Sequence, residues 1–161
     1  MLRAEVVATA RAMAAEGMVK GTEGNVSARD GDALHITPAG LPYGEMSPDD
    51  LVTLDLTGMV VAGEREPSSE RAVHLAIYAA RPDVLAIVHT HGPAATARSA
   101  PATDLPVAEY AEPGTRELAE RATRALGQGD AVLMPRHGVV AVGAGLTEAL
   151  EIARRVEAVS V

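Results

Sequence analysis

Two histidines stand one residue apart at the end of an apolar run, in the stretch VLAIVHTHG that covers residues 84–92. Side chains two positions apart on a strand point to the same face, so His89 and His91 project together if a strand reaches residue 91. Imidazoles placed in this way can bind one zinc ion, at about 2.0–2.1 Å from each nitrogen. Two core histidines bonded to the backbone would show the same short pattern, so this pair alone leaves both interpretations open.

A third histidine, His137, also follows an apolar run, AVLMPR, and directly precedes Gly138. Open α/β sheets place their sites beyond the ends of strands, and three histidines are the protein ligands of many catalytic zinc sites. The chain has no cysteine, so a metal would need histidine and carboxylate ligands. The three histidines therefore favour a catalytic metal site that leaves positions for water or substrate.

The other two histidines are weaker candidates. His35 lies in an alternating stretch beside Ile36, where a structural role is the favoured interpretation. His74 follows Glu70 by four residues, and the sequence ERAVH lacks the HExxH arrangement of a helical zinc site. We expect His74 to pack in the core, or to contact the metal ligands without binding the metal itself.

The stretch EPSSERAVH suggests a second kind of site, for an anion. The hydroxyls of Ser68 and Ser69, with free backbone N–H groups at the start of a predicted helix, could bind a phosphate. The glycine-rich GTEGNVS would add backbone donors and an asparagine amide. Simple helix capping by the serines, and dipole compensation by Glu70, explain the same residues equally well.

The elements that would position these residues alternate between short strands and helices. Apolar periodicity, capping residues and glycine stops predict helices and strands along the whole chain. The expected helices cover 2–17, 70–80, 114–129 and 146–161, the last capped by Thr147, with another helix after Pro93. The expected strands cover 25–29, 33–37, 51–56, 84–89 and 105–110, and two more flank Pro135 within 131–143. This order favours one α/β sandwich domain over residues 1–161, rather than a parallel doubly wound sheet.

Composition excludes several classes of function. The net charge of −8, with no Phe and no Trp, argues against nucleic-acid binding, which uses basic residues and aromatic platforms. No apolar run approaches the roughly 20 residues that a membrane span needs. The N-terminal stretch has scattered charges instead of the uncharged core of a signal peptide. We therefore expect a cytoplasmic protein with no membrane and no nucleic-acid partner.

Taken together and in order, the motifs resemble the class II aldolase/adducin family, and most closely its L-fuculose-1-phosphate aldolase branch. The resemblance runs from about residue 3 to residue 160. Each motif is weak by itself, whereas the ordered set is specific. The motifs are GTEGNVSAR, ITPAGLPY, PSSERAVHLAIYAARPD, AIVHTHG, GTRELAE and RHGVVAVG.

The resemblance implies a role for each matching residue. It implies that three histidines bind Zn²⁺, with Mn²⁺ or Co²⁺ as alternatives, and that Glu70 is the acid/base that can also close the metal shell. Tyr110 falls where these aldolases keep a tyrosine near the aldehyde. The implied metal ligands are His89, His91, His137 and Glu70, and the implied phosphate-binding residues are Gly24, Asn25, Gly40, Ser68 and Ser69.

The implied fold is a three-layer α/β/α sandwich around a mixed, largely antiparallel sheet, assembled as a homotetramer with sites between subunits. The implied activity is zinc-dependent cleavage of a phosphorylated ketose, similar to L-fuculose 1-phosphate, to dihydroxyacetone phosphate and an aldehyde. Alternatives are a metal-dependent decarboxylase, a sugar-phosphate 4-epimerase, or a non-catalytic adducin-like interaction domain. Epimerases of the family tend to have Asp at the position of Glu70, and an interaction domain has no need of an intact ligand set.

The sequence departs from the aldolase pattern at three points. Ala39 replaces a residue that commonly carries a hydroxyl before Gly40, and only AEP separates Tyr110 from GTRELAE, where the aldolases have a longer stretch. The sequence ends at Val161, before the C-terminal tail that commonly covers a site. The differences after Tyr110 and at Val161 fall at the aldehyde end, so the resemblance does not determine which aldehyde is released.

Overall fold

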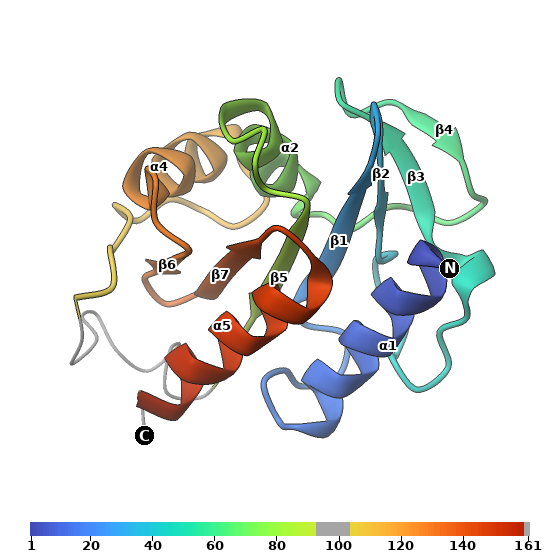
Figure 1. Ribbon diagram of the computed structural model, residues 1–161, viewed down its shortest axis with the longest axis horizontal. Helices are drawn as coiled ribbons and strands as arrows, with labels where there is room; N and C mark the ends of the chain where they lie inside the picture. The colour runs from blue at the N-terminus through green and yellow to red at the C-terminus, as the bar shows by residue number, and fades with distance from the viewer. Residues whose placement is uncertain (93–103, 160–161) are drawn as a thin grey trace.

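A computed structural model of the chain describes residues 1–92 and 104–159 (Figure 1). Its central element, within these residues, is a seven-stranded sheet in the order β4-β3-β2-β1-β5-β7-β6, and all neighbouring strands run antiparallel. The strands are β1 (Asn25–Asp30), β2 (Ala33–Ile36), β3 (Val52–Asp55), β4 (Val60–Ala62), β5 (Ala86–Thr90), β6 (Ala131–Met134) and β7 (Gly138–Gly143).

Helices cover both faces of this sheet, which gives the expected α/β/α layering. The helices are α1 (Leu2–Ala15), α2 (Arg71–Ala80), α4 (Arg116–Leu126) and α5 (Leu146–Val159), besides a 3-10 turn at Pro48–Asp50. Figure 1 shows α1 and α5 in front of the sheet, with α2 and α4 on the far side. In the part of the chain that the structure describes, no helix is both long and apolar enough to span a membrane.

The two cores follow from the alternation of side chains along the strands. On β5, Ala86 and Val88 pack in the core that α1 and α5 cover, whereas Ile87 packs in the core of α2 and α4. On β1, Val26 and Ala28 face the first core. Asn25 and Ser27, which alternate with them on β1, are polar and hydrogen-bond to His74 of α2.

The predicted elements are largely confirmed, with differences at their ends. Helix α5 begins at Leu146, so Thr147 lies inside its first turn and the predicted cap is wrong. The strand expected over 105–110 is reduced to one parallel bridge, between Val107 and Leu133. The exposed edge strand β4 was not predicted, because it is only three residues long. The helix expected after Pro93 lies outside the described residues.

Three strand ends meet at one end of the sheet and bring distant parts of the sequence together. The first residue of β1, Asn25, is paired with His89 near the end of β5. His89 is in turn paired with Val140, near the start of β7. Because antiparallel pairing places these ends side by side, the histidine motifs and the glycine-rich loop before β1 converge there.

Candidate active site

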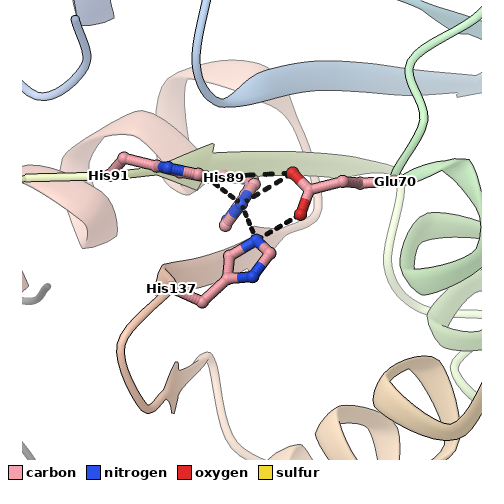
Figure 2. A group of neighbouring side chains, drawn as sticks. All are labelled: Glu70, His89, His91 and His137. Atoms are coloured by element: carbon pink, nitrogen blue, oxygen red, sulfur yellow. Dashed lines mark hydrogen bonds and ion pairs between the residues drawn. The ribbon is translucent and has the colours of Figure 1, made fainter. Parts of the chain in front are cut away.

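Four side chains from three separate segments converge on one point (Figure 2). Their potential ligand atoms all lie within 4.8 Å of one another, in a cluster of Glu70, His89, His91 and His137. The Nε2 atom of His89 lies 2.8 Å from Nε2 of His91 and 3.1 Å from Nε2 of His137. Glu70 Oε2 lies 2.9 Å from His89 Nε2, and Glu70 Oε1 forms an ion pair with His137. All the residues of the expected metal set are therefore together.

The protonation of these groups suits a divalent metal. Nδ1 of His89 lies 2.9 Å from the carbonyl oxygen of Val139, which can only accept, so Nδ1 carries the proton and Nε2 offers its lone pair. Burial lowers the pKa of His89, against the opposing effect of Glu70, and keeps the ring in the neutral form that metals bind. The buried Nδ1 of His137 has no hydrogen-bond partner among the described residues. A cation shared by the three Nε2 atoms and the carboxylate would satisfy these converging acceptors.

Glu70 is held as a carboxylate inside this cluster. Burial opposes its ionisation, but its interactions with His89, His137 and His91 outweigh burial and lower the Glu70 pKa well below its usual range. The Asn25 side-chain amide also donates to Oε2 at 2.9 Å. Glu70 is the residue that immediately precedes α2, so the helix fixes its backbone next to the histidines.

The backbone around the histidines is tightly packed. Strand β5 ends at Thr90, yet His91 remains aligned with His89 because its N–H donates to the carbonyl of Met18 at 3.0 Å. His137 sits in the turn between β6 and β7. The next residue, Gly138, approaches β5 so closely that a Cβ atom would lie 1.9 Å from the carbonyl oxygen of Thr90.

Gly138→Ala is expected to destabilise the protein and to displace His137. The methyl group would clash with backbone, which cannot move aside as a flexible side chain can, and such overpacking costs about 1–3 kcal/mol or more. The midpoint temperature of thermal unfolding and the metal content should both be lower than in the wild-type protein. Gly44→Ala is the matched control, because a Cβ atom there meets nothing within 4 Å. Equal effects of the two substitutions would contradict the close-approach argument.

A cavity of about 630 Å³ opens beside the cluster. Its walls include Glu70, His91 and His137, while His89 lies behind them, 1 % exposed. All the residues expected to bind phosphate also line it: Gly24, Asn25, Gly40, Ser68 and Ser69. The candidate metal ligands and the candidate phosphate donors thus face one space.

The serines do not start the helix that follows them. Helix α2 begins at Arg71, and Ser68 accepts a hydrogen bond at 3.3 Å from the N–H of Glu70. Ser68 is buried, whereas Ser69 is exposed at the cavity. Their hydroxyls are placed where an anion in the cavity could meet them.

Two cations in the cavity wall were missed by the sequence analysis, Lys20 and Arg136. Lys20 is the single lysine of the sequence and stands directly before the GTEGN motif, a signal that could have found it. Arg136 adopts a φ of 60°, which non-glycine residues seldom do, and nothing in the sequence indicated this. Both add positive charge next to the candidate phosphate donors.

Tyr110 is the one expected site residue that lies neither in the metal cluster nor in the cavity wall. It is absent from the described lining, and 46 % of its surface is exposed. Its hydroxyl donates to Glu112 at 2.9 Å, and its ring lies 5.9 Å from the Arg136 guanidinium carbon. Any contact of Tyr110 with substrate would require a neighbouring subunit or a movement.

The two remaining histidines lie outside the cluster, as expected. Nδ1 of His35 bonds to the Thr53 hydroxyl at 2.9 Å, on the far part of the sheet. His74 is 1 % exposed and bonds both to Ser27 and to Asn25. Burial lowers the pKa of His74 to about 3, so its ring is neutral.

Fold and site together define a metal-dependent enzyme built on an α/β/α sandwich. The chain belongs to the class II aldolase and adducin family: residues 4–160 match the family described as the Class II Aldolase and Adducin N-terminal domain. This confirms the expected family and makes the protein a metal-dependent aldehyde-lyase.

Relatives that are named as aldolases agree with this assignment. The chain is 40% identical to a 5-methylthioribulose-1-phosphate/5-deoxyribulose-1-phosphate aldolase of Rhodospirillum rubrum, over 97% of this chain and 77% of the relative. It is 38% identical to the L-fuculose phosphate aldolase of Escherichia coli K12, over 97% of this chain and 79% of the relative. Both alignments span 171 positions, more than the 161 residues of this chain, so they contain gaps on its side.

Solved structures share the whole architecture. An L-fuculose 1-phosphate aldolase superposes with a TM-score of 0.94 at 36% identity, covering 99% of this chain and 82% of that one. YgbL from Escherichia coli, described as a putative aldolase/epimerase/decarboxylase, superposes with a TM-score of 0.91 at 27% identity. That match covers 99% of this chain and 86% of YgbL.

Proposed function

We propose that the protein cleaves a ketose 1-phosphate, similar to L-fuculose 1-phosphate, to dihydroxyacetone phosphate and an aldehyde, with Zn²⁺ as its metal. One observation carries the proposal: a single cavity is lined both by the Glu70 and histidine cluster and by the candidate phosphate donors. Relatives that act on L-fuculose phosphate and on 5-deoxyribulose 1-phosphate support the same substrate class.

In this proposal the loop residues hold the phosphate and set the register of the substrate. Backbone N–H groups near Gly24 and Gly40 and the hydroxyls of Ser68 and Ser69 would donate to phosphate oxygens. The positive charge of Lys20 would attract the phosphate. Holding the reacting carbons in a fixed position can lower a barrier by several kcal/mol.

His89, His91 and His137 would hold the metal, with the carboxylate of Glu70 beside it. When bound, the metal supplies a Lewis acid that polarises the ketone carbonyl of the substrate. In the cleavage direction the bond between C3 and C4 would break, the C4 hydroxyl would give up its proton to solvent, from which the Glu70 carboxylate would take up one proton, and C4 would become the aldehyde carbon. Glu70 would deliver a proton to C3, which completes dihydroxyacetone phosphate, and would remove it in the reverse reaction.

Tyr110 would serve the aldehyde end from a neighbouring subunit of a homotetramer. Its exposed position outside the cavity of its own chain supports this arrangement. Tyr110→Phe would then lower the rate at which the aldehyde is released or added more than the rate at which dihydroxyacetone phosphate exchanges its proton with solvent.

The test of this function separates the two halves of the reaction. Zinc-loaded protein is incubated with L-fuculose 1-phosphate, 5-deoxyribulose 1-phosphate and 5-methylthioribulose 1-phosphate, and release of dihydroxyacetone phosphate is measured. In parallel, NMR follows the entry of deuterium from D₂O into dihydroxyacetone phosphate. We expect deuterium entry together with cleavage of at least one of the sugars. No exchange at full zinc occupancy would refute the proposal and favour decarboxylation of a phosphorylated acid.

Ser69→Ala is expected to raise KM for phosphorylated substrates with little change in kcat. The lost hydroxyl removes one hydrogen bond to a charged group, worth roughly 1.5–3 kcal/mol, or about tenfold or more in affinity. Unphosphorylated analogues should be affected little. An equal loss on both kinds of substrate would argue against a phosphate contact at Ser69.

A further inference from the structure

A chain of buried polar side chains leads from the core under α2 to the carboxylate of Glu70. The Tyr78 hydroxyl lies 2.8 Å from Ser27 Oγ, which lies 2.7 Å from Nδ1 of His74. Nε2 of His74 bonds to Oδ1 of Asn25, whose Nδ2 donates to Glu70 Oε2 at 2.9 Å. Each of the four residues before Glu70 is at most 2 % exposed.

This chain crosses a core that is otherwise apolar. Ser27 shares its sheet face with Ile87 of the neighbouring strand, and His74 and Tyr78 lie on α2 beside Ile77. Buried polar groups cost free energy unless every one of them is hydrogen-bonded, and apolar side chains of similar size could fill the same space. The metal cluster itself does not include any of these residues.

The direction of every hydrogen bond in the chain can be assigned, starting from Glu70. An ionised carboxylate can only accept, so Asn25 must face it with its NH₂ group. The carbonyl oxygen of Asn25 then faces His74, so Nε2 of His74 must carry the ring proton. Nδ1 of the neutral ring accepts from the Ser27 hydroxyl, and the Ser27 oxygen accepts from the hydroxyl of Tyr78.

The assignment gives His74 a specific effect on Glu70. Without a donor at Nε2, the Asn25 amide could turn over and present its oxygen to the carboxylate, where the two acceptors would repel each other. With the donor in place, only one amide orientation is satisfied. Asn25 also lines the cavity, so the same contact fixes the orientation of an amide in the cavity wall.

We propose that His74 is a positioning residue, which locks the Asn25 amide and thereby holds Glu70 Oε2 in place for proton transfer. The role of Glu70 in proton transfer rests on the proposed function. The single tautomer of His74 and the fixed orientation of the Asn25 amide do not depend on that function. Tyr78 and Ser27 complete the lock by holding the unprotonated Nδ1.

The tautomer is tested first, because it requires no activity. Nitrogen-15 NMR of the zinc-loaded wild-type protein should show His74 protonated at Nε2 and unprotonated at Nδ1. Protonation at Nδ1, or a mixture of the two tautomers, would overturn the proposal whether or not the protein is an aldolase.

Two substitutions then test the effect on chemistry. His74→Leu removes the N–H donor and should lower the rate of deuterium entry into dihydroxyacetone phosphate by about 10- to 100-fold. Losses in this range are typical when a residue that orients metal ligands through hydrogen bonds is replaced. His74→Gln keeps an N–H donor and a carbonyl acceptor, and should recover much of the loss. Zinc content and circular dichroism establish that both variants are folded and loaded. Equal rates of deuterium entry for His74→Leu, His74→Gln and the wild type would overturn the proposal.

A double-mutant cycle distinguishes positioning from general damage. If His74 acts through Glu70, His74→Leu should cause little further loss in a Glu70→Gln protein. The same fold-loss in both backgrounds would mean that the leucine harms the site by another route, and would overturn the proposal. Absence of exchange in the zinc-loaded wild type would refute the proposed function instead, and the tautomer measurement would still decide the structural claim.

Discussion

Glu70→Gln is expected to abolish most of the turnover while most of the metal stays bound. The three imidazoles of the cluster remain, so metal binding continues, but an amide cannot accept and deliver a proton. General acid–base catalysis typically contributes ~10²–10⁴-fold, and kcat should fall by a factor in this range. Metal content is measured by elemental analysis, and kcat by the release of dihydroxyacetone phosphate.

The control for this substitution is Glu120→Gln, which makes the same chemical change on the exposed face of α4. It should leave both metal content and turnover unchanged. Wild-type turnover in Glu70→Gln would assign the proton transfer to another residue. Complete loss of metal would instead show that the carboxylate is an indispensable ligand.

His137→Ala is expected to remove most of the bound metal and nearly all of the activity while the protein remains folded. The substitution takes away one of three imidazole ligands, and the two that remain are poor competitors for a divalent cation. The turn that carries His137 is closed by its backbone, since its N–H donates to the carbonyl of Met134 at 3.1 Å. The fold should therefore survive, which circular dichroism can verify.

His35→Ala is the matched control, because it removes a histidine that lies on β2 and bonds to Thr53 outside the cluster. Its zinc content and activity should equal those of the wild type. Full zinc occupancy in His137→Ala would contradict the three-histidine assignment.

The layered fold could be predicted from local patterns in the sequence. Alternating apolar residues, helical periodicity and glycine stops are properties of neighbouring residues, and they located the strands and helices that the structure contains. The missed strand β4 and the reduced strand at 105–110 are too short for such a pattern, and their pairing depends on partners elsewhere in the chain.

The candidate site was predicted because its residues stand at strand and helix ends in recognisable motifs. His89 lies near the end of the apolar strand β5, His91 and His137 follow apolar strands, and Glu70 directly precedes a helix. The ordered set of motifs then connected them to one family. Their individual roles stay predictions, which the substitutions described above can test.

Only the tertiary structure decided what surrounds these residues. It placed Tyr110 outside the cavity of its own chain and brought Lys20 and Arg136 into the cavity wall, where the sequence analysis had not placed them. It also joined His74 to Glu70 through Asn25, residues that lie on different elements. Sequence patterns report the face on which a side chain lies, because that depends on local geometry. Contacts between side chains depend on the register of the strands and the packing of α2 across the sheet, and these are determined only when the whole chain folds.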